Sequence, residues 1–261
     1  MTRPIVFMTD YGRTDEFVGV CHGVMASVAP DARVIDLTHD LPRQDVMRGA
    51  LTLGRATKYM PSDAVYVAVV DPGVGSERRS IAVRAATGAL LVGPDNGLLS
   101  VAWAALGGAE AAAAIEDSRV LLFPVSKTFH GRDVFAPAGA HLANGTPLEA
   151  VGPSLDPADL RTLEMPGPMV ADGALGCRVI GVDGFGNVQL NARASDLEEA
   201  GIGPLLQVGG RALPRVSIFA DVPEGVLACI VDSQGYLALV VNHGSAAQLL
   251  NVKEGSAVVL E

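Results

Sequence analysis

An aspartate, an arginine and a histidine stand in two polar clusters of a largely apolar chain, and together they could perform acid–base chemistry. Asp71 opens a glycine-rich segment that also contains Arg78, and His130 lies in a second polar segment. The apolar run 65–70, directly before Asp71, is typical of a buried strand that ends at a loop. Because ligands bind outside the carboxyl ends of strands in open α/β sheets, these side chains are candidates for catalysis. Each also has a structural explanation, as a turn former, a solvated charge or a buried imidazole.

A further carboxylate, Asp10, follows the first apolar run of the chain, residues 5–8. A carboxylate at the end of a first strand can accept two hydrogen bonds from a ribose diol, as acidic residues do in nucleotide-binding folds. Asp10 could equally cap a helix or form a turn, because it precedes a helical pattern. The residues alone leave both interpretations open.

Polar and aromatic side chains also gather at glycine-containing turns in the second half of the chain. Phe185 could offer an aromatic face while Asp183 and Asn187 hold a polar group of a substrate, or the segment could be a plain turn. The segments 232–236 and 242–246 could present backbone groups to a base, or they could be hairpin turns.

The elements that must position these residues fall into two patterns. Strand-like and helix-like segments alternate at first, which predicts an α/β fold with a mostly parallel sheet flanked by helices. Beyond the Pro/Gly-rich residues 166–168, short strand-like runs separated by glycine turns predict a smaller all-β domain, sandwich or barrel. We therefore expect domains at residues 1–166 and 167–261. The expected strands of the first are 4–8, 34–37, 64–70, 80–84 and 89–92, and its expected helices are 16–28, 46–59, 97–106 and 133–144.

Composition narrows the class of protein. The net charge of −10 disfavours nucleic acid or an anionic membrane as partner. No apolar run approaches the ~18 residues that span a bilayer, and the first apolar run lacks the basic region and cleavage site of a signal peptide. Cys21, Cys177 and Cys229 are widely spaced and form no CxxC pair. They are typical of buried reduced thiols, so we expect a cytoplasmic protein.

Taken in order, the motifs resemble those of the S-adenosyl-L-methionine (SAM) hydroxide adenosyltransferase family, the water-using relatives of fluorinase and chlorinase. The resemblance extends over nearly the whole chain, and the motifs are highly specific as a set. They are Phe-Met-Thr-Asp-Tyr-Gly at 7–12, Thr-His-Asp-Leu-Pro-Arg-Gln-Asp-Val at 38–46, Val-Asp-Pro-Gly-Val-Gly at 70–75, Gly-Pro-Asp-Asn-Gly-Leu-Leu at 93–99, Thr-Phe-His-Gly-Arg-Asp at 128–133, Phe-Gly-Asn-Val at 185–188 and Asn-His-Gly-Ser-Ala at 242–246.

The resemblance implies an enzyme that hydrolyses SAM to adenosine and L-methionine, with no metal and no organic cofactor. It implies an α/β N-terminal domain and a β-barrel C-terminal domain. It further implies a homotrimer, with each site between the N-terminal domain of one subunit and the C-terminal domain of its neighbour.

The resemblance also implies roles for individual residues. By motif, Asp10 matches the ligand of the ribose diol, and Asp71, Arg78 and His130 match a triad that holds the nucleophilic water. Asp183 and Ser233 match groups that bind the methionine amine and carboxylate, and Phe185, Asn187, Asn242 and Gly244 match positions around the adenine.

This chemistry suits the residues. Attack at C5′ expels methionine as a neutral thioether, so no metal or general acid is needed, and the nearest metal-ligand candidates, His39, Asp40 and His130, lack a convincing spacing. We expect His130 with Asp71 to remove or share a proton of the water, an effect worth ~10²–10⁴-fold; which residue takes the proton stays open. Three alternatives remain: a halide-using 5′-halogenase, which the Asp71 carboxylate disfavours by repelling a halide, a non-catalytic SAM- or adenosine-binding protein, and a metal-dependent hydrolase.

Overall fold

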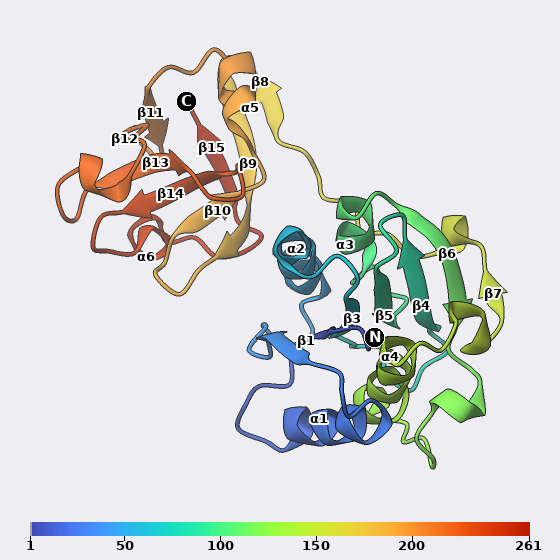
Figure 1. Ribbon diagram of the computed structural model, residues 1–261. Coiled ribbons are helices and arrows are strands. Elements are labelled where there is room, and N and C mark those ends of the chain that lie inside the picture. The colour runs from blue at the N-terminus through green and yellow to red at the C-terminus, as the bar shows by residue number, and fades with distance from the viewer. Residues whose placement is uncertain (1) are drawn as a thin grey trace. The chain divides into compact units, whose positions relative to one another are not determined.

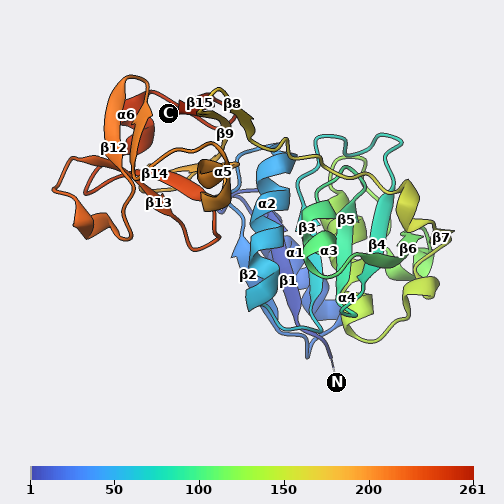
Figure 2. The same cartoon turned by 90° about the horizontal axis from the view of Figure 1, so that it is seen from above.

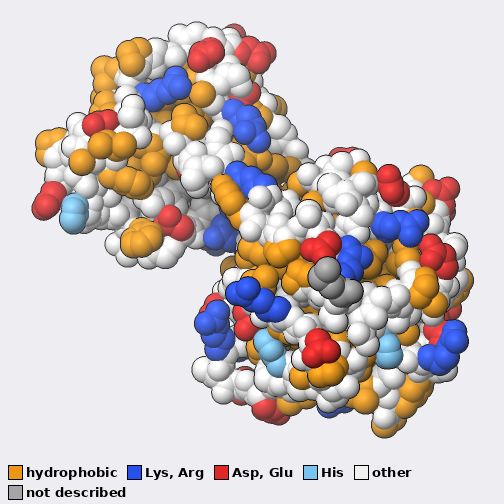
Figure 3. Space-filling model, viewed as in Figure 1, with side chains coloured by type: hydrophobic (Ala, Val, Ile, Leu, Met, Phe, Trp, Pro, Cys, Tyr) orange, Lys and Arg blue, Asp and Glu red, His pale blue; other side chains and the backbone are white. Residues whose placement is uncertain are grey.

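The structure is a computed structural model that describes residues 2–261. The chain forms two compact units, one ending at Leu163 and the other beginning at Glu164 (Figure 1). Each unit has its own hydrophobic core. Apolar side chains reach the surface of both units, where they are interspersed with charged side chains of both signs (Figure 3). None of the helices formed by the described residues is long and apolar enough to cross a membrane.

The first unit is built on a seven-stranded sheet with the order β2-β1-β3-β5-β4-β6-β7. The neighbours from β2 to β5 are parallel, whereas β4, β6 and β7 pair antiparallel. The sheet is therefore mixed, and the prediction of a mostly parallel sheet is wrong. The strands are β1 (Ile5–Thr9), β2 (Val34–Thr38), β3 (Val65–Val69), β4 (Ser80–Ala85), β5 (Leu90–Pro94), β6 (Ala109–Ala114) and β7 (Ser154–Leu155).

The length of one connection explains this difference. Only residues 86–89 join β4 to β5. Parallel neighbours need a crossover of about a dozen residues or more, whereas a short turn can only join antiparallel strands. The short connection therefore reverses the chain direction at β4, and the sheet becomes mixed from that strand onward.

Helices cover both faces of this sheet (Figures 1 and 2). Because successive side chains of a strand point to opposite faces, Ile5 and Phe7 pack in one apolar cluster and Val6 and Met8 in another. The first cluster includes residues of α1 and α4, and the second includes residues of α2 and α3. The helices are α1 (Phe17–Val28), α2 (Val46–Ala56), α3 (Ser100–Ala105) and α4 (Ala136–Ala143), and each lies within a helical segment expected from the sequence.

The second unit is an antiparallel, nearly closed, barrel-like sheet with the order β12-β11-β15-β9-β10-β14-β13, and β8 pairs with β9. The two edge strands of this sheet, β12 and β13, approach one another. Arg215, just after β12, forms an isolated β-bridge to Cys229 of β13. The elements are β8 (Met169–Ala171), β9 (Ala174–Val182), β10 (Val188–Leu190), α5 (Ala194–Glu199), β11 (Leu205–Val208), β12 (Arg211–Pro214), β13 (Leu227–Val231), β14 (Leu237–Val241), α6 (Ala246–Leu250) and β15 (Ala257–Leu260).

Candidate active site

The loop between β3 and β4 brings Asp71 and Arg78 together in the first unit. Arg78 Nε lies 3.0 and 3.1 Å from the two carboxylate oxygens of Asp71, and Arg78 Nη2 lies 2.5 Å from Oδ2. The side chains of Arg78 and Asp71 are only 10% and 5% exposed. Such a multiply hydrogen-bonded, water-poor pair has a fixed orientation, because the guanidinium fork matches the carboxylate geometry.

The same guanidinium reaches the third residue of the predicted triad. Arg78 Nη2 lies 2.8 Å from Nδ1 of His130, and Nη1 donates to Ser80 Oγ at 2.7 Å. Asp71, Arg78 and His130 are thus one hydrogen-bonded cluster, with Arg78 at its centre. The structure brings together residues that are far apart in the sequence.

Close packing of two loops makes this cluster possible. Gly75 has a φ of +77°, and a Cβ at this position would overlap the carbonyl oxygen of Lys127. The loop after β3 therefore packs directly against the segment that leads to His130. A larger residue at position 75 would separate Arg78 from His130.

The hydrogen bond from Arg78 defines the protonation of His130. An arginine only donates hydrogen bonds, so Nδ1 of His130 accepts and the proton of the neutral imidazole is on Nε2. Burial lowers the pKa of His130 below its ordinary value, and the positive charge of Arg78 lowers it further, against the opposing effects of Asp71 and Asp133. At neutral pH the imidazole is therefore uncharged and keeps one N–H donor on Nε2.

A π-helical turn, Gly131–Phe135, begins directly after His130. π-Helical turns are rare and frequent at functional sites. The buried Asp133 carboxylate holds this region, because it accepts hydrogen bonds from Ser126 N at 2.8 Å and from Arg132 Nε at 2.6 Å. Asp133 therefore positions the segment that carries His130.

Asp10 lies beside the triad. Its Oδ2 atom accepts a hydrogen bond of 2.8 Å from the backbone N–H of Gln44, which has a left-handed backbone with φ +63°. Asp10, Asp71 and His130 line one cavity of about 140 Å³. Its other lining residues are Tyr11, Gln44, Val69, Val74, Thr128 and Gly131. This volume holds a few water molecules, at roughly 30 Å³ each, and a small part of a ligand.

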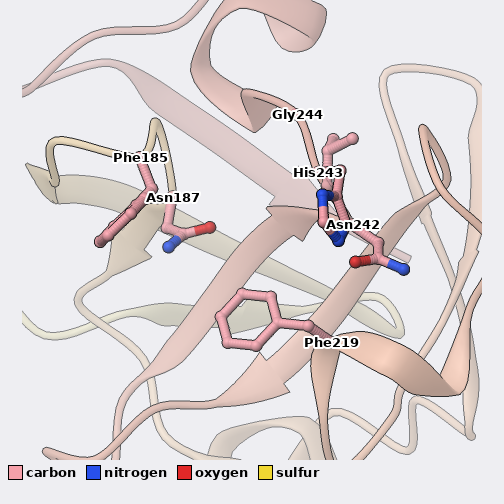
Figure 4. A pocket seen from close by; sticks show the side chains of 7 residues that line it. Phe185, Asn187, Phe219, Asn242, His243 and Gly244 are labelled. Atoms are coloured by element: carbon pink, nitrogen blue, oxygen red, sulfur yellow. The ribbon is translucent and has the colours of Figure 1, made fainter.

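A second cavity, of about 600 Å³, lies in the barrel-like unit and has the size of a typical ligand pocket. Four predicted adenine-binding residues, Phe185, Asn187, Asn242 and Gly244, line it together with Phe219, Val241 and His243. Figure 4 shows the ring of Phe219 between the side chains of Phe185 and Asn187 on one side and those of Asn242 and His243 on the other. Aromatic rings and side-chain amides therefore face the same cavity.

The two predicted methionine-binding residues are placed differently. Asp183 organises the turn that carries Phe185 and Asn187, because its Oδ1 accepts hydrogen bonds from both of their backbone N–H groups at 2.9 Å. Ser233 is exposed in the turn between β13 and β14 and does not line the cavity. The structure therefore groups Asp183 with the adenine-binding candidates and leaves Ser233 apart from them.

The structure adds lining residues for which the sequence predicts no role. In the first cavity the most informative are Tyr11 and Gln44, which belong to the motifs at 7–12 and 38–46 and could have been found there. In the second cavity, Phe219 belongs to none of the motifs. Only the fold brings Phe219 to the site.

Comparison with known proteins gives consistent matches over both units. The family model described as the SAM hydroxide adenosyltransferase N-terminal domain matches residues 5–152, and the model of the C-terminal domain matches residues 177–259. A protein of Salinispora tropica named (R)-S-adenosyl-L-methionine hydrolase is 51% identical, covering 96% of this chain and 95% of its own. A protein of the same name from Thermus thermophilus is 42% identical, covering 99% of both chains.

More distant relatives include a fluorinase of Nocardia brasiliensis, which is 34% identical over 98% of this chain and 96% of its own. Among solved structures, an uncharacterised conserved protein from Thermotoga maritima superposes with a TM-score of 0.89. It is 35% identical and covers 98% of this chain and 99% of its own.

Proposed function

The chain belongs to the SAM hydroxide adenosyltransferase family, and we propose that it hydrolyses SAM to adenosine and L-methionine by attack of water on the ribose C5′. One observation carries this proposal: Asp71 and His130, which Arg78 joins by hydrogen bonds, line a cavity together with Asp10. The name of relatives that are 42–51% identical supports the same reaction.

The leaving group makes the reaction simple. Water forms the C5′–O bond while the C5′–S⁺ bond breaks, and methionine departs as a neutral thioether that needs no proton. The water must lose one proton, so the protein has to supply an acceptor and orient the nucleophile. We expect no metal or organic cofactor in this reaction.

The triad provides both the proton acceptor and the groups that orient the water. His130, neutral with its proton on Nε2, donates a hydrogen bond to the oxygen of the water and fixes its position. Because Nδ1 is occupied by Arg78, the proton acceptor is a carboxylate oxygen of Asp71. Arg78 holds that carboxylate in place and stabilises the negative charge that develops on the oxygen. General base catalysis of this kind contributes roughly 10²–10⁴-fold.

Asp71 also opposes the use of halide. The Asp71 carboxylate is only 5% exposed, and a halide beside it would experience repulsion in a medium that screens charge poorly. The fluorinase of Nocardia brasiliensis is 34% identical to this chain, less than the 51% and 42% of the hydrolases from Salinispora tropica and Thermus thermophilus. Water is therefore the nucleophile that this site favours.

Substrate binding divides between the two units. In the first unit, we assign the ribose diol to Asp10. In the second, we assign the adenine to the cavity of Phe185, Asn187, Asn242 and Gly244, and the methionine end to Asp183 and Ser233. These assignments follow the resemblance to the family; Asp10 lines the first cavity and the four adenine-binding candidates line the second, whereas Asp183 and Ser233 line neither.

The proposed assembly is a cytoplasmic homotrimer in which each site joins the first unit of one subunit to the second unit of its neighbour. The cavity beside the triad, at about 140 Å³, is smaller than the roughly 300–1,000 Å³ of a typical ligand pocket, which supports completion by another surface. The three cysteines are free and buried, which agrees with a reducing compartment.

Isotope labelling tests the reaction directly. The protein is incubated with SAM in ¹⁸O-labelled water containing chloride and a strong chelator, and the nucleoside is analysed by mass spectrometry. We expect adenosine carrying one ¹⁸O atom, with an equal amount of methionine. A 5′-chlorinated nucleoside, tight SAM binding without methionine release, or activity lost with the chelator would each contradict the proposal.

A further inference from the structure

Two histidines and an aspartate of the first unit form a cluster of side chains that the proposed reaction does not use. His22 lies on α1, Asp36 on β2, and His39 follows β2. Nε2 of His22 and Nε2 of His39 lie 2.8 and 2.9 Å from the same oxygen, Oδ1 of Asp36. One ligand atom from each residue lies within 4.8 Å of the other two. Side chains from two segments, α1 and the end of β2, therefore converge on one point.

The cluster is held in place by buried neighbours. The side chain of His39 is only 2% exposed, and its Nδ1 atom lies 2.9 Å from the hydroxyl of Thr9. The fully buried ring of Phe7 contacts both imidazoles, with centroid distances of 5.7 Å to His22 and 4.8 Å to His39. The Nε2 atom of His39 is thus directed at Asp36 before any ligand arrives, which reduces the cost of ordering a site.

The opposite side of the cluster is open to solvent. The side chain of Asp36 is 41% exposed and that of His22 is 34% exposed. An ion could therefore reach the carboxylate oxygens of Asp36 from the solvent.

We propose that His22, Asp36 and His39 form a binding site for a divalent transition-metal ion, and that zinc fits it best. Two imidazole nitrogens and one carboxylate oxygen are ligands that zinc accepts in tetrahedral sites, and three protein ligands leave a fourth position for water. The ion replaces the two hydrogen bonds between the Nε2 atoms and Oδ1, and each imidazole that binds it through the Nε2 lone pair carries its single proton on Nδ1.

Thr9 would orient the ligand His39 in this site without binding the ion itself. With the metal on Nε2, the Nδ1–H group of His39 donates to the Thr9 hydroxyl oxygen. Histidines that bind metals usually make such a hydrogen bond with their second nitrogen, and its loss typically weakens metal binding by about 10–100-fold. The ion ties α1 to β2, and its ligands are not members of the triad.

Metal titration of the whole protein tests this site. Protein freed of metal with a chelator is titrated with zinc chloride by calorimetry and with cobalt(II) by visible absorption, which reports a tetrahedral site. We expect one ion per chain. His22→Asn and Asp36→Asn should each weaken zinc binding by about 10-fold or more, and Thr9→Val by about 10–100-fold. The matched control is His141→Asn, a partly buried histidine on α4, which should bind zinc as the unmodified protein does.

X-ray absorption of the zinc-loaded protein gives a readout that needs no variant. We expect two imidazole nitrogens, oxygen ligands and no sulfur. Absence of saturable binding, a sulfur ligand, or a single imidazole would overturn the proposal. So would binding that His22→Asn leaves unchanged, or binding that His130→Asn abolishes, because the ion would then lie elsewhere.

Discussion

Replacing Asp71 with asparagine removes one charge from the centre of the proposed site and changes almost nothing in shape. The carboxylate accepts hydrogen bonds from Nε and Nη2 of Arg78 on both of its oxygens. Asparagine offers one oxygen and one NH₂ group, so a donor of the new side chain faces a donor of the guanidinium. The variant loses both the proposed proton acceptor and part of the hold on Arg78.

The structure indicates how large the two effects should be. Loss of a general base costs about 10²–10⁴-fold in kcat. Loss of one partner of a buried ion pair costs up to roughly 3–5 kcal/mol of folding stability, and Asp71 and Arg78 are buried to this degree, at 5% and 10% exposed. Since Asp71 acts on the water rather than on SAM, the Kd for SAM should change little.

Asp95 provides a matched control for the loss of stability. Its side chain is 3% exposed and accepts a hydrogen bond of 2.8 Å from Arg79 Nε, but it lines neither cavity. Asp95→Asn should therefore lower the melting temperature as Asp71→Asn does, without the loss in kcat. The assay combines initial rates of adenosine formation at saturating SAM, calorimetric binding of SAM and thermal unfolding.

Two results would refute this reasoning. A kcat of folded Asp71→Asn within 10-fold of the unmodified protein would mean that the carboxylate is not the proton acceptor. An equal loss of kcat in Asp95→Asn would mean that a general loss of stability, and not chemistry, lowers the rate.

Four further predictions concern other parts of the site. Asp10→Ala should weaken SAM binding by about 2–3 kcal/mol through loss of charge-assisted hydrogen bonds to the ribose, and unchanged calorimetric binding would contradict this role. Burial and the neighbouring guanidinium lower the pKa of His130 below its ordinary value, so kcat/KM should be constant at neutral and mildly alkaline pH and should fall in the acid range, where the imidazole gains a proton; a profile that rises toward acid would refute the neutral form. Gly131→Ala should raise KM and cost about 1–3 kcal/mol of stability, because its Cβ would overlap the Tyr11 hydroxyl, and an unchanged melting temperature would show that the overlap is relieved. Phe219→Ala should weaken SAM binding by about 0.5–1.5 kcal/mol through loss of aromatic contact, and calorimetry would contradict this if the Kd stayed the same.

The sequence predicts the individual strands of the first unit better than their directions. An apolar run followed by Asp-Pro-Gly correctly identifies β3 and the loop with Asp71. By contrast, β6 is the run Ala109–Ala114, in which alanine, a poor strand former, predominates. The run forms a strand because it pairs with β4 and β7. Tertiary pairing overrides local preference there, and no local pattern reveals it.

The same limit applies to side chains that meet in space. The sequence points to His39, Asp40 and His130 as the nearest metal-ligand candidates, whereas the structure joins His39 to His22 and Asp36. That grouping depends on the position of α1 beside β2, which no spacing in the sequence encodes. The triad is different, because Asp71 and His130 lie in two of the motifs and Arg78 lies in the polar segment that Asp71 opens. The close approach at Gly75 then brings the two segments together.

The geometry also explains why the central residue of the triad is an arginine. Arg78 donates hydrogen bonds from Nε and Nη2 to Asp71, from Nη2 to His130 and from Nη1 to Ser80. Its guanidinium carbon also lies 5.2 Å from the centre of the Phe135 ring. A lysine ammonium is a single point charge and cannot bind a carboxylate bidentately while stacking on a ring. A guanidinium has no hydrogen-bond acceptor, so Arg78 donates to Nδ1 of His130, which accepts. In the proposed reaction, Asp71 therefore takes the proton of the water, and the imidazole of His130 holds the oxygen.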